Sequence, residues 1–136
     1  MKIGKIDHLG LACRSADAAE KLYAGALGLP VTHRETLEAM KLKVVKLKTG
    51  ESVLELLEPL PGEDVVSKFL ASRGEGIHHV CFEVEDVAAA TAELKAKGYS
   101  PVWPEPRPGA EGRIVNFLRP KETFGVLIEL SQKPVA

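Results

Sequence analysis

The fold of this chain is decided by the stretch IDHLGLA at residues 6–12, because a related stretch, IHHVCFE, recurs at residues 77–83. A second pair follows the same order, since VLELL at residues 53–57 corresponds to LIELS at residues 127–131. His79 lies 71 positions after His8 and Glu129 lies 74 positions after Glu55, so the two copies run nearly in step. The repetition predicts two similar structural modules in one chain.

The first copy contains a strand, a helix and then further strands. Residues 5–13 are rich in β-formers and predict a strand in which His8 shares a face with Ile6 and Gly10. Ser15 is a suitable N-cap for a helix over 16–27, which Gly28 ends. Two strands follow, at 43–48 and 52–57, and residues 31–35 form an additional short strand in the alternative order. The expected order is therefore β-α-β-β or β-α-β-β-β.

The second copy repeats this plan. Asp86 is the expected N-cap of a helix over 87–97, and strands follow near 114–118 and 126–131. The proline-rich segment 101–109 predicts an ordered loop. Between the copies, a short amphipathic helix is expected near 64–71, with four apolar side chains on one face, Val65, Val66, Phe69 and Leu70. The predicted class is α+β, with two tandem βαβββ modules that form curled, barrel-like mixed sheets.

Length and composition predict one domain. The 136 residues include 45% hydrophobic and 27% charged residues, enough for one hydrophobic core over 1–136. We expect module one at about 1–60, a connector helix at about 61–74 and module two at about 75–136. The net charge of −1 and the 5% aromatic content do not suggest nucleic-acid binding. No signal-peptide core or membrane-spanning run is present, so we expect a cytoplasmic protein with no membrane partner.

The repeated histidines and glutamates predict a metal centre. One histidine in an apolar strand is most often a packed core residue, but His8, Glu55, His79 and Glu129 occupy matched positions in both copies. Strand parity singles out His79, and His78 should face the other way. Imidazole and carboxylate without thiolate suit Co²⁺, Ni²⁺, Mn²⁺, Fe²⁺ or Zn²⁺. Cys13 and Cys81 match no zinc spacing and are expected to be buried free thiols.

Four segments carry a family resemblance that extends from Lys5 to about Gln132. These segments are IDHLG at 6–10, LELLEPL at 54–60, RGEGIHHV at 73–80 and FLRPKETFGVLIEL at 117–130. The chain resembles the vicinal-oxygen-chelate superfamily, and within it the methylmalonyl-CoA epimerases. The third and fourth segments are the narrower motifs, whereas the His-Leu-Gly and Glu-Leu pieces are common to many members.

The resemblance implies a function and a set of roles. His8, Glu55, His79 and Glu129 correspond to the metal ligands of the family, for which Co²⁺ is expected first and Zn²⁺, Ni²⁺ or Mn²⁺ are alternatives. Some members have glutamine at the position of Glu55, and a second glutamate should weaken the pull of the site on an anionic substrate. The implied reaction interconverts (R)- and (S)-methylmalonyl-CoA through an enolate, with Glu129 as the first candidate base and Glu55 as its counterpart. Lys43 lies near the position where some members have a glutamate base, and a homodimer is usual for relatives of this size.

Two other functions remain open from the sequence. A glyoxalase I-type lyase or isomerase acting on a thiohemiacetal uses the same histidine and glutamate set. A metal-free small-molecule binding protein of the bleomycin-resistance kind has the same fold without any need for four matched ligands. An extradiol dioxygenase uses two histidines and one glutamate, so the second glutamate argues against that activity.

Overall fold

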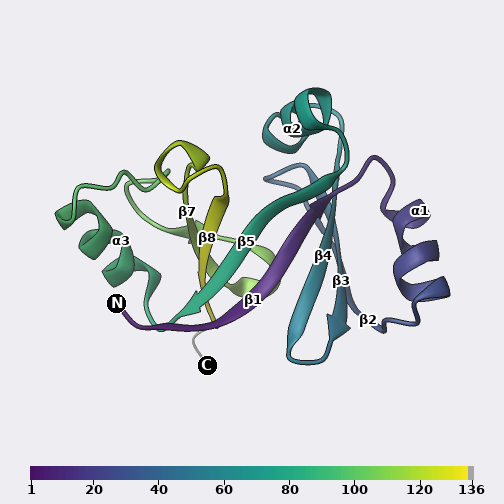
Figure 1. Cartoon of the computed structure of the whole chain (residues 1–136), viewed down its shortest axis with the longest axis horizontal. Coiled ribbons are helices and arrows are strands. Elements are labelled where there is room, and N and C mark those ends of the chain that lie inside the picture. The colour runs from purple at the N-terminus through teal and green to yellow at the C-terminus, as the bar shows by residue number, and fades with distance from the viewer. Residues whose placement is uncertain (135–136) are drawn as a thin grey trace. The chain divides into compact units, whose positions relative to one another are not determined.

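The computed structural model of this chain describes residues 1–134 and has the mixed α+β architecture that the repeat predicts (Figure 1). No helix within these residues is both long and apolar enough to cross a membrane. The first half contains β1 (Ile3–Ala12), α1 (Ala16–Glu20), β2 (Val31–Leu37), β3 (Leu42–Thr49), β4 (Ser52–Pro59) and α2 (Val65–Arg73). The second half contains β5 (Gly76–Val84), α3 (Val87–Ala96), β6 (Arg107–Pro108), β7 (Ile114–Leu118) and β8 (Leu127–Gln132). The α+β class and the two βαβββ modules are confirmed, including the short strand expected at 31–35.

The chain divides into two compact units whose boundaries fall immediately before two of the predicted ligands. The N-terminal unit is His8–His78, and the C-terminal unit combines Met1–Asp7 with the chain from His79 onward. The first strand therefore begins in the C-terminal unit and continues into the other. Each histidine of the predicted metal centre is the first residue after a crossing from one unit to the other.

The N-terminal unit holds a mixed sheet in the order β2-β3-β4-β1. Strand β1 pairs with β4 in parallel, whereas β3 pairs with β2 and β4 in antiparallel orientation. The parallel pair requires a long crossover, which runs through α1, β2 and β3. Helix α1 packs against this sheet through a core of five buried residues, Cys13, Ala16, Val45, Leu47 and Leu56. A second core, which includes Val66 and Leu70, fixes α2 on β3 and β4.

The C-terminal unit repeats this topology in the order β5-β8-β7-β6. Strand β5 is parallel to β8, and β7 is antiparallel to both β8 and β6. Helix α3 covers the sheet through Val87 and Ala90, which pack with Val84 and Leu130. The proline-rich segment is mostly loop, and its two strand residues, Arg107–Pro108, lie at the edge, where a proline breaks no central ladder.

Both helix caps that the sequence predicts, Ser15 and Asp86, are present in the structure. Ser15 Oγ accepts a hydrogen bond from Ala18 N at 3.1 Å, and Asp86 Oδ1 accepts one from Ala89 N at 3.0 Å. Helix α2 begins at Val65, and the carboxylate of Glu63, which precedes the helix, accepts hydrogen bonds from Val66 N at 2.9 Å and from the next amide. The Asp64 side chain makes no capping bond.

Two details of the helices differ from the sequence prediction. Val65 is 62% exposed, so it does not share the apolar face of α2 with Val66 and Leu70. The cause is the 100° step per residue, which turns position 65 away once Val66 and Leu70 face the core. The predicted helix over 16–27 is α-helical only to Glu20 and continues as a π-helix over Lys21–Ala26.

The cap of α3 can be tested by mutation. Replacing Asp86 with alanine removes the acceptor for the Ala89 amide and should lower the free energy of unfolding by about 1 kcal/mol. Urea denaturation followed by circular dichroism measures this change. Asp64→Ala is the matched control, because the Asp64 side chain caps nothing, and it should change stability much less. Equal losses in the two variants would contradict the assigned cap.

Candidate metal centre

The two predicted ligand pairs occupy the same register in the two sheets. In the N-terminal unit His8 pairs with Val53 and Gly10 with Glu55. In the C-terminal unit His79 pairs with Leu127 and Cys81 with Glu129. In both, the glutamate lies opposite the residue two positions after the histidine, which puts the imidazole and the carboxylate on one face of neighbouring parallel strands.

The N-terminal pair is buried and includes a third charged side chain. His8 Nε2 lies 3.4 Å from Glu55 Oε2, and Lys46 Nζ lies 3.9 Å from the same oxygen. His8 is 4% exposed, and Glu55 and Lys46 are each 7% exposed. A carboxylate removed from water to this extent requires a compensating charge or hydrogen bond, and these two neighbours are placed to supply it.

The C-terminal pair is closer. His79 Nε2 lies 2.9 Å from Glu129 Oε1, and both side chains are buried. The His79 ring also packs edge-on against Phe117, which in turn contacts the ring of Trp103. The contact with Phe117 helps to fix the orientation of the imidazole.

The choice between the adjacent histidines agrees with strand parity. His78 packs its ring against Phe69 of α2 at a centroid distance of 5.1 Å, in a T-shaped arrangement. His79 has the opposite direction and contacts Glu129. His78 is therefore a packing residue, as expected for a side chain on the other face of β5.

Lys43 contacts helix α1. Its Nζ lies 3.0 Å from Asp17 Oδ1 on α1, and this hydrogen bond raises the pKa of the lysine above its ordinary value. A lysine held in its charged form by a surface carboxylate has no free lone pair with which to act as a base. The possibility that Lys43 replaces the glutamate base of some relatives has no support from these contacts.

Lys46, the charged neighbour of Glu55, is a site residue that was not predicted from the sequence. Lys46 and Glu55 are direct cross-strand partners in the antiparallel β3–β4 ladder. A signal for this pairing was present, because the short turn at Gly50 sets Thr49 opposite Ser52 and so brings Lys46 opposite Glu55. A lysine at an otherwise buried strand position is unusual and marks a site with a charge to balance.

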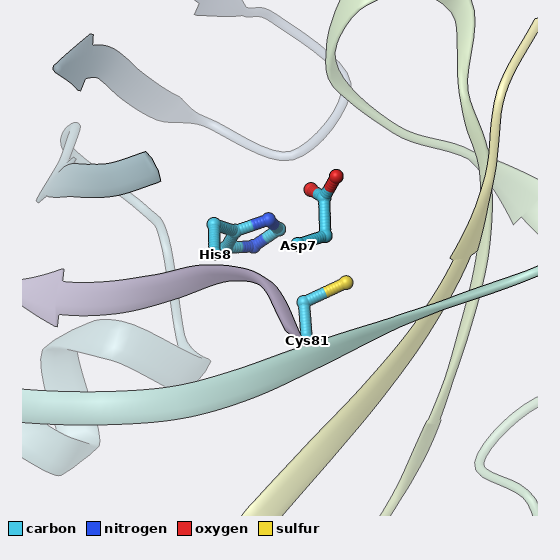
Figure 2. A group of neighbouring side chains, drawn as sticks. All are labelled: Asp7, His8 and Cys81. Carbon is cyan, nitrogen blue, oxygen red and sulfur yellow. The ribbon is translucent and has the colours of Figure 1, made fainter. Parts of the chain in front are cut away.

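Both cysteines are buried free thiols, as predicted. Figure 2 shows Cys81 with Asp7 and its chain neighbour His8, and the Cys81 sulfur and an Asp7 carboxylate oxygen lie within 4.8 Å of each other. The Asp7 carboxylate already binds Arg113, whose Nη2 lies 3.2 Å from Oδ1. Asp7 and Cys81 are thus assigned to the structure of the C-terminal unit, and the ligand candidates remain the two His–Glu pairs.

The donor set limits the chemistry. Each pair offers one imidazole nitrogen and one carboxylate, with no thiolate, which is the set preferred by borderline divalent ions and not by closed structural zinc sites. Each pair is buried, so a bound cation would lie where its charge is weakly screened. A Lewis acid at such a site stabilises negative charge that develops on a substrate oxygen.

Comparison with known proteins establishes the family. The chain belongs to the Glyoxalase/Bleomycin resistance/Dioxygenase superfamily, whose family pattern matches residues 7–117. It is 36% identical to the ethylmalonyl-CoA/methylmalonyl-CoA epimerase of Cereibacter sphaeroides, over 96% of this chain and 98% of that protein. It is also 35% identical to the uncharacterised protein YqjC of Bacillus subtilis, over 96% of this chain and 93% of that protein. Among solved structures, a variant of Streptomyces coelicolor methylmalonyl-CoA epimerase in complex with 2-nitronate-propionyl-CoA has a TM-score of 0.92 and 37% identity, covering 98% of this chain and 100% of that one.

The burial of the Cys13 thiol can be tested by alkylation. Burial, reinforced by Glu58 and Glu75, raises the pKa of Cys13 to about 11. Iodoacetamide reacts with the thiolate, so Cys13 in the folded protein should be alkylated at pH 8 at least 100-fold more slowly, as an order of magnitude, than in denaturing urea. Peptide mass spectrometry measures both rates. Rapid native labelling of Cys13 would contradict its burial.

Proposed function

We propose that this chain is a metal-dependent methylmalonyl-CoA epimerase. The observation that carries the proposal is the pair of buried His–Glu couples at identical register, His8 with Glu55 and His79 with Glu129. Relatives that match nearly the whole chain are methylmalonyl-CoA epimerases by name, and one solved neighbour is such an enzyme in complex with methylmalonyl-CoA and NH₄⁺. Activity, substrate and site are therefore proposed together.

The two couples are proposed to bind one divalent ion through His8, Glu55, His79 and Glu129. The fit rests on the donors themselves, because two neutral imidazoles and two carboxylates suit such an ion and exclude none of Co²⁺, Zn²⁺, Ni²⁺ or Mn²⁺. Co²⁺ is proposed first. Within each unit the histidine and the glutamate lie on neighbouring parallel strands. When bound, the ion supplies a Lewis acid for the thioester and carboxylate oxygens of the substrate.

The proton chemistry is assigned to the glutamates. The substrate proton lies on the carbon between the thioester and the free carboxylate, and its removal gives an enolate that must be reprotonated on the other face. Glu129 is the proposed base, and Glu55, its counterpart in the repeat, is the proposed partner on the opposite face. A carboxylate has two oxygens, so one can remain a ligand while the other takes the proton. Burial of these side chains excludes water and reduces the screening of charges in the site.

A homodimer and a cytoplasmic location stay predictions. Sedimentation velocity of the purified protein tests the first, and fractionation of the source cells tests the second. The catalytic proposal depends on neither, since the ligands and bases named above all come from one chain.

The ligand set predicts a contrast between adjacent histidines. His79→Ala removes an imidazole donor, so the purified variant should lose most of its stoichiometric metal while its circular dichroism spectrum stays that of the wild type. His78→Ala, which loses the packing on Phe69, should retain metal. Elemental analysis after dialysis measures both. Loss of metal in His78→Ala with retention in His79→Ala would show that the wrong histidine is assigned.

Proton abstraction predicts solvent exchange. Product formed in deuterated water should carry deuterium on the carbon between the thioester and the carboxylate. Glu129→Gln keeps the shape of the side chain but cannot accept the proton, so exchange should fall on the order of 100-fold or more while acyl-CoA binding changes much less. Mass spectrometry of the product gives the exchange rate.

The same assay separates the alternatives. Near-wild-type exchange in Glu129→Gln would remove Glu129 from an essential role. Turnover of a methylglyoxal–thiol adduct by metal-loaded protein that leaves methylmalonyl-CoA unchanged would assign the chain to the glyoxalase I-type activity instead. A folded, metal-free protein that binds a small molecule but turns over neither substrate would be a binding protein.

A further inference from the structure

Lys46 is a buried lysine whose position the proposed proton chemistry does not explain. It lies on β3 directly opposite Glu55 on β4, and its Nζ lies 3.9 Å from Glu55 Oε2. Its exposed fraction is 7%, although lysine is almost never buried to this extent without an anionic partner. Glu55 holds His8 through the same oxygen, at 3.4 Å. Lys46 therefore adds a positive charge at one of the proposed ligands.

The residue that corresponds to Lys46 in the other half of the repeat is uncharged. The residue opposite Glu129 in the antiparallel β7–β8 ladder is Phe117, which corresponds to Lys46 opposite Glu55. Phe117 packs against His79 and contributes no charge. The duplication thus retains the histidine and the glutamate in both halves but differs at this third position, which is a lysine in one half and a phenylalanine in the other.

A count of charges shows what the lysine changes. Two carboxylates cancel the charge of a divalent ion, and neutral histidines add nothing, so the four ligands alone give a neutral centre. A neutral centre has little attraction for a substrate with a free carboxylate. The Lys46 ammonium restores a net charge of +1, and the burial of the pair limits screening by solvent.

We propose that Lys46 offsets the charge of Glu55, so that the centre attracts acyl-CoA substrates that carry a free carboxylate next to the thioester. This inference rests on the proposed function and names the residue that sets its substrate class. Lys46 has no assigned part in proton transfer. It acts through its charge, and the accompanying cost is weaker binding of the metal cation.

Calorimetry with a matched pair of ligands tests the proposal without turnover. Malonyl-CoA carries the free carboxylate and acetyl-CoA lacks it, so the ratio of their affinities for Co²⁺-loaded protein reports the attraction for that group. The wild type should prefer malonyl-CoA. Lys46→Met should lose on the order of tenfold of that preference, with acetyl-CoA affinity unchanged, because only malonyl-CoA places an acyl carboxylate near the lost cation. Equal preference in wild type and Lys46→Met overturns the proposal.

Three further variants separate charge from structure. Lys46→Arg retains the cation and should retain the preference. Lys43→Met is the matched control on the same strand, since Lys43 pairs with Asp17 on the surface, and it should behave as the wild type. The double variant Lys46→Met/Glu55→Gln removes both charges, leaves no unpaired buried carboxylate at this position and restores a net charge of +1, so it should regain the preference. This variant also keeps the test valid if Lys46→Met alone fails to fold.

Metal affinity gives a second readout that does not depend on acyl-CoA. Removing the nearby cation in Lys46→Met should tighten Co²⁺ binding on the order of tenfold, and Lys46→Arg should not. Unchanged or weaker Co²⁺ binding in folded Lys46→Met overturns the charge offset. A different outcome is tighter Co²⁺ binding by Lys46→Met together with no binding of either acyl-CoA by the wild type. That result would support the charge offset between Lys46 and Glu55, but it would reject the proposed substrate class and the epimerase function.

Discussion

The parallel pairing of the first and last strands of each repeat is the constraint on which the rest of the structure depends. This pairing brings a histidine near the start of one strand to the same face as a glutamate in the other, although the two are far apart in the sequence. It also requires a long crossover, and the helix and two intervening strands of each unit provide it. The topology and the ligand geometry thus follow from one arrangement of strands.

Burial of the two glutamates is the energetic consequence of that arrangement. Glu55 and Glu129 are buried in mostly apolar strands, and an unpaired carboxylate there would destabilise the fold by several kcal/mol, as an order of magnitude. Each carboxylate has a histidine beside it, and Glu55 also has Lys46. The side chains that suit a metal ion are therefore the same side chains that make the buried acids tolerable.

The two halves of the repeat share the histidine and the glutamate but differ in the residue opposite the glutamate. Lys46 and Phe117 occupy equivalent places opposite the two glutamates, so the duplicated halves offer unlike surroundings to a ligand. A substrate with a carboxylate on one side of its reacting carbon and a thioester on the other is itself unsymmetrical. The difference between the halves supports the proposed preference for a substrate of this kind.

The sequence by itself determined the elements and the candidate ligands. Repetition identified His8, Glu55, His79 and Glu129, strand parity separated His79 from His78, and local chemistry identified the caps Ser15 and Asp86. These features depend on residues close together in the chain or on the comparison of one copy with the other. Both kinds of information can be obtained from a linear sequence.

Only the tertiary structure decided which charges meet. Lys43 and Lys46 lie three positions apart on one strand, yet the first pairs with Asp17 on a helix and the second with buried Glu55. The exposure of Val65 likewise depends on which side of α2 faces β3 and β4. The reason is physical: the direction of a side chain is local, but its partner is set by the packing of elements that are distant in the sequence.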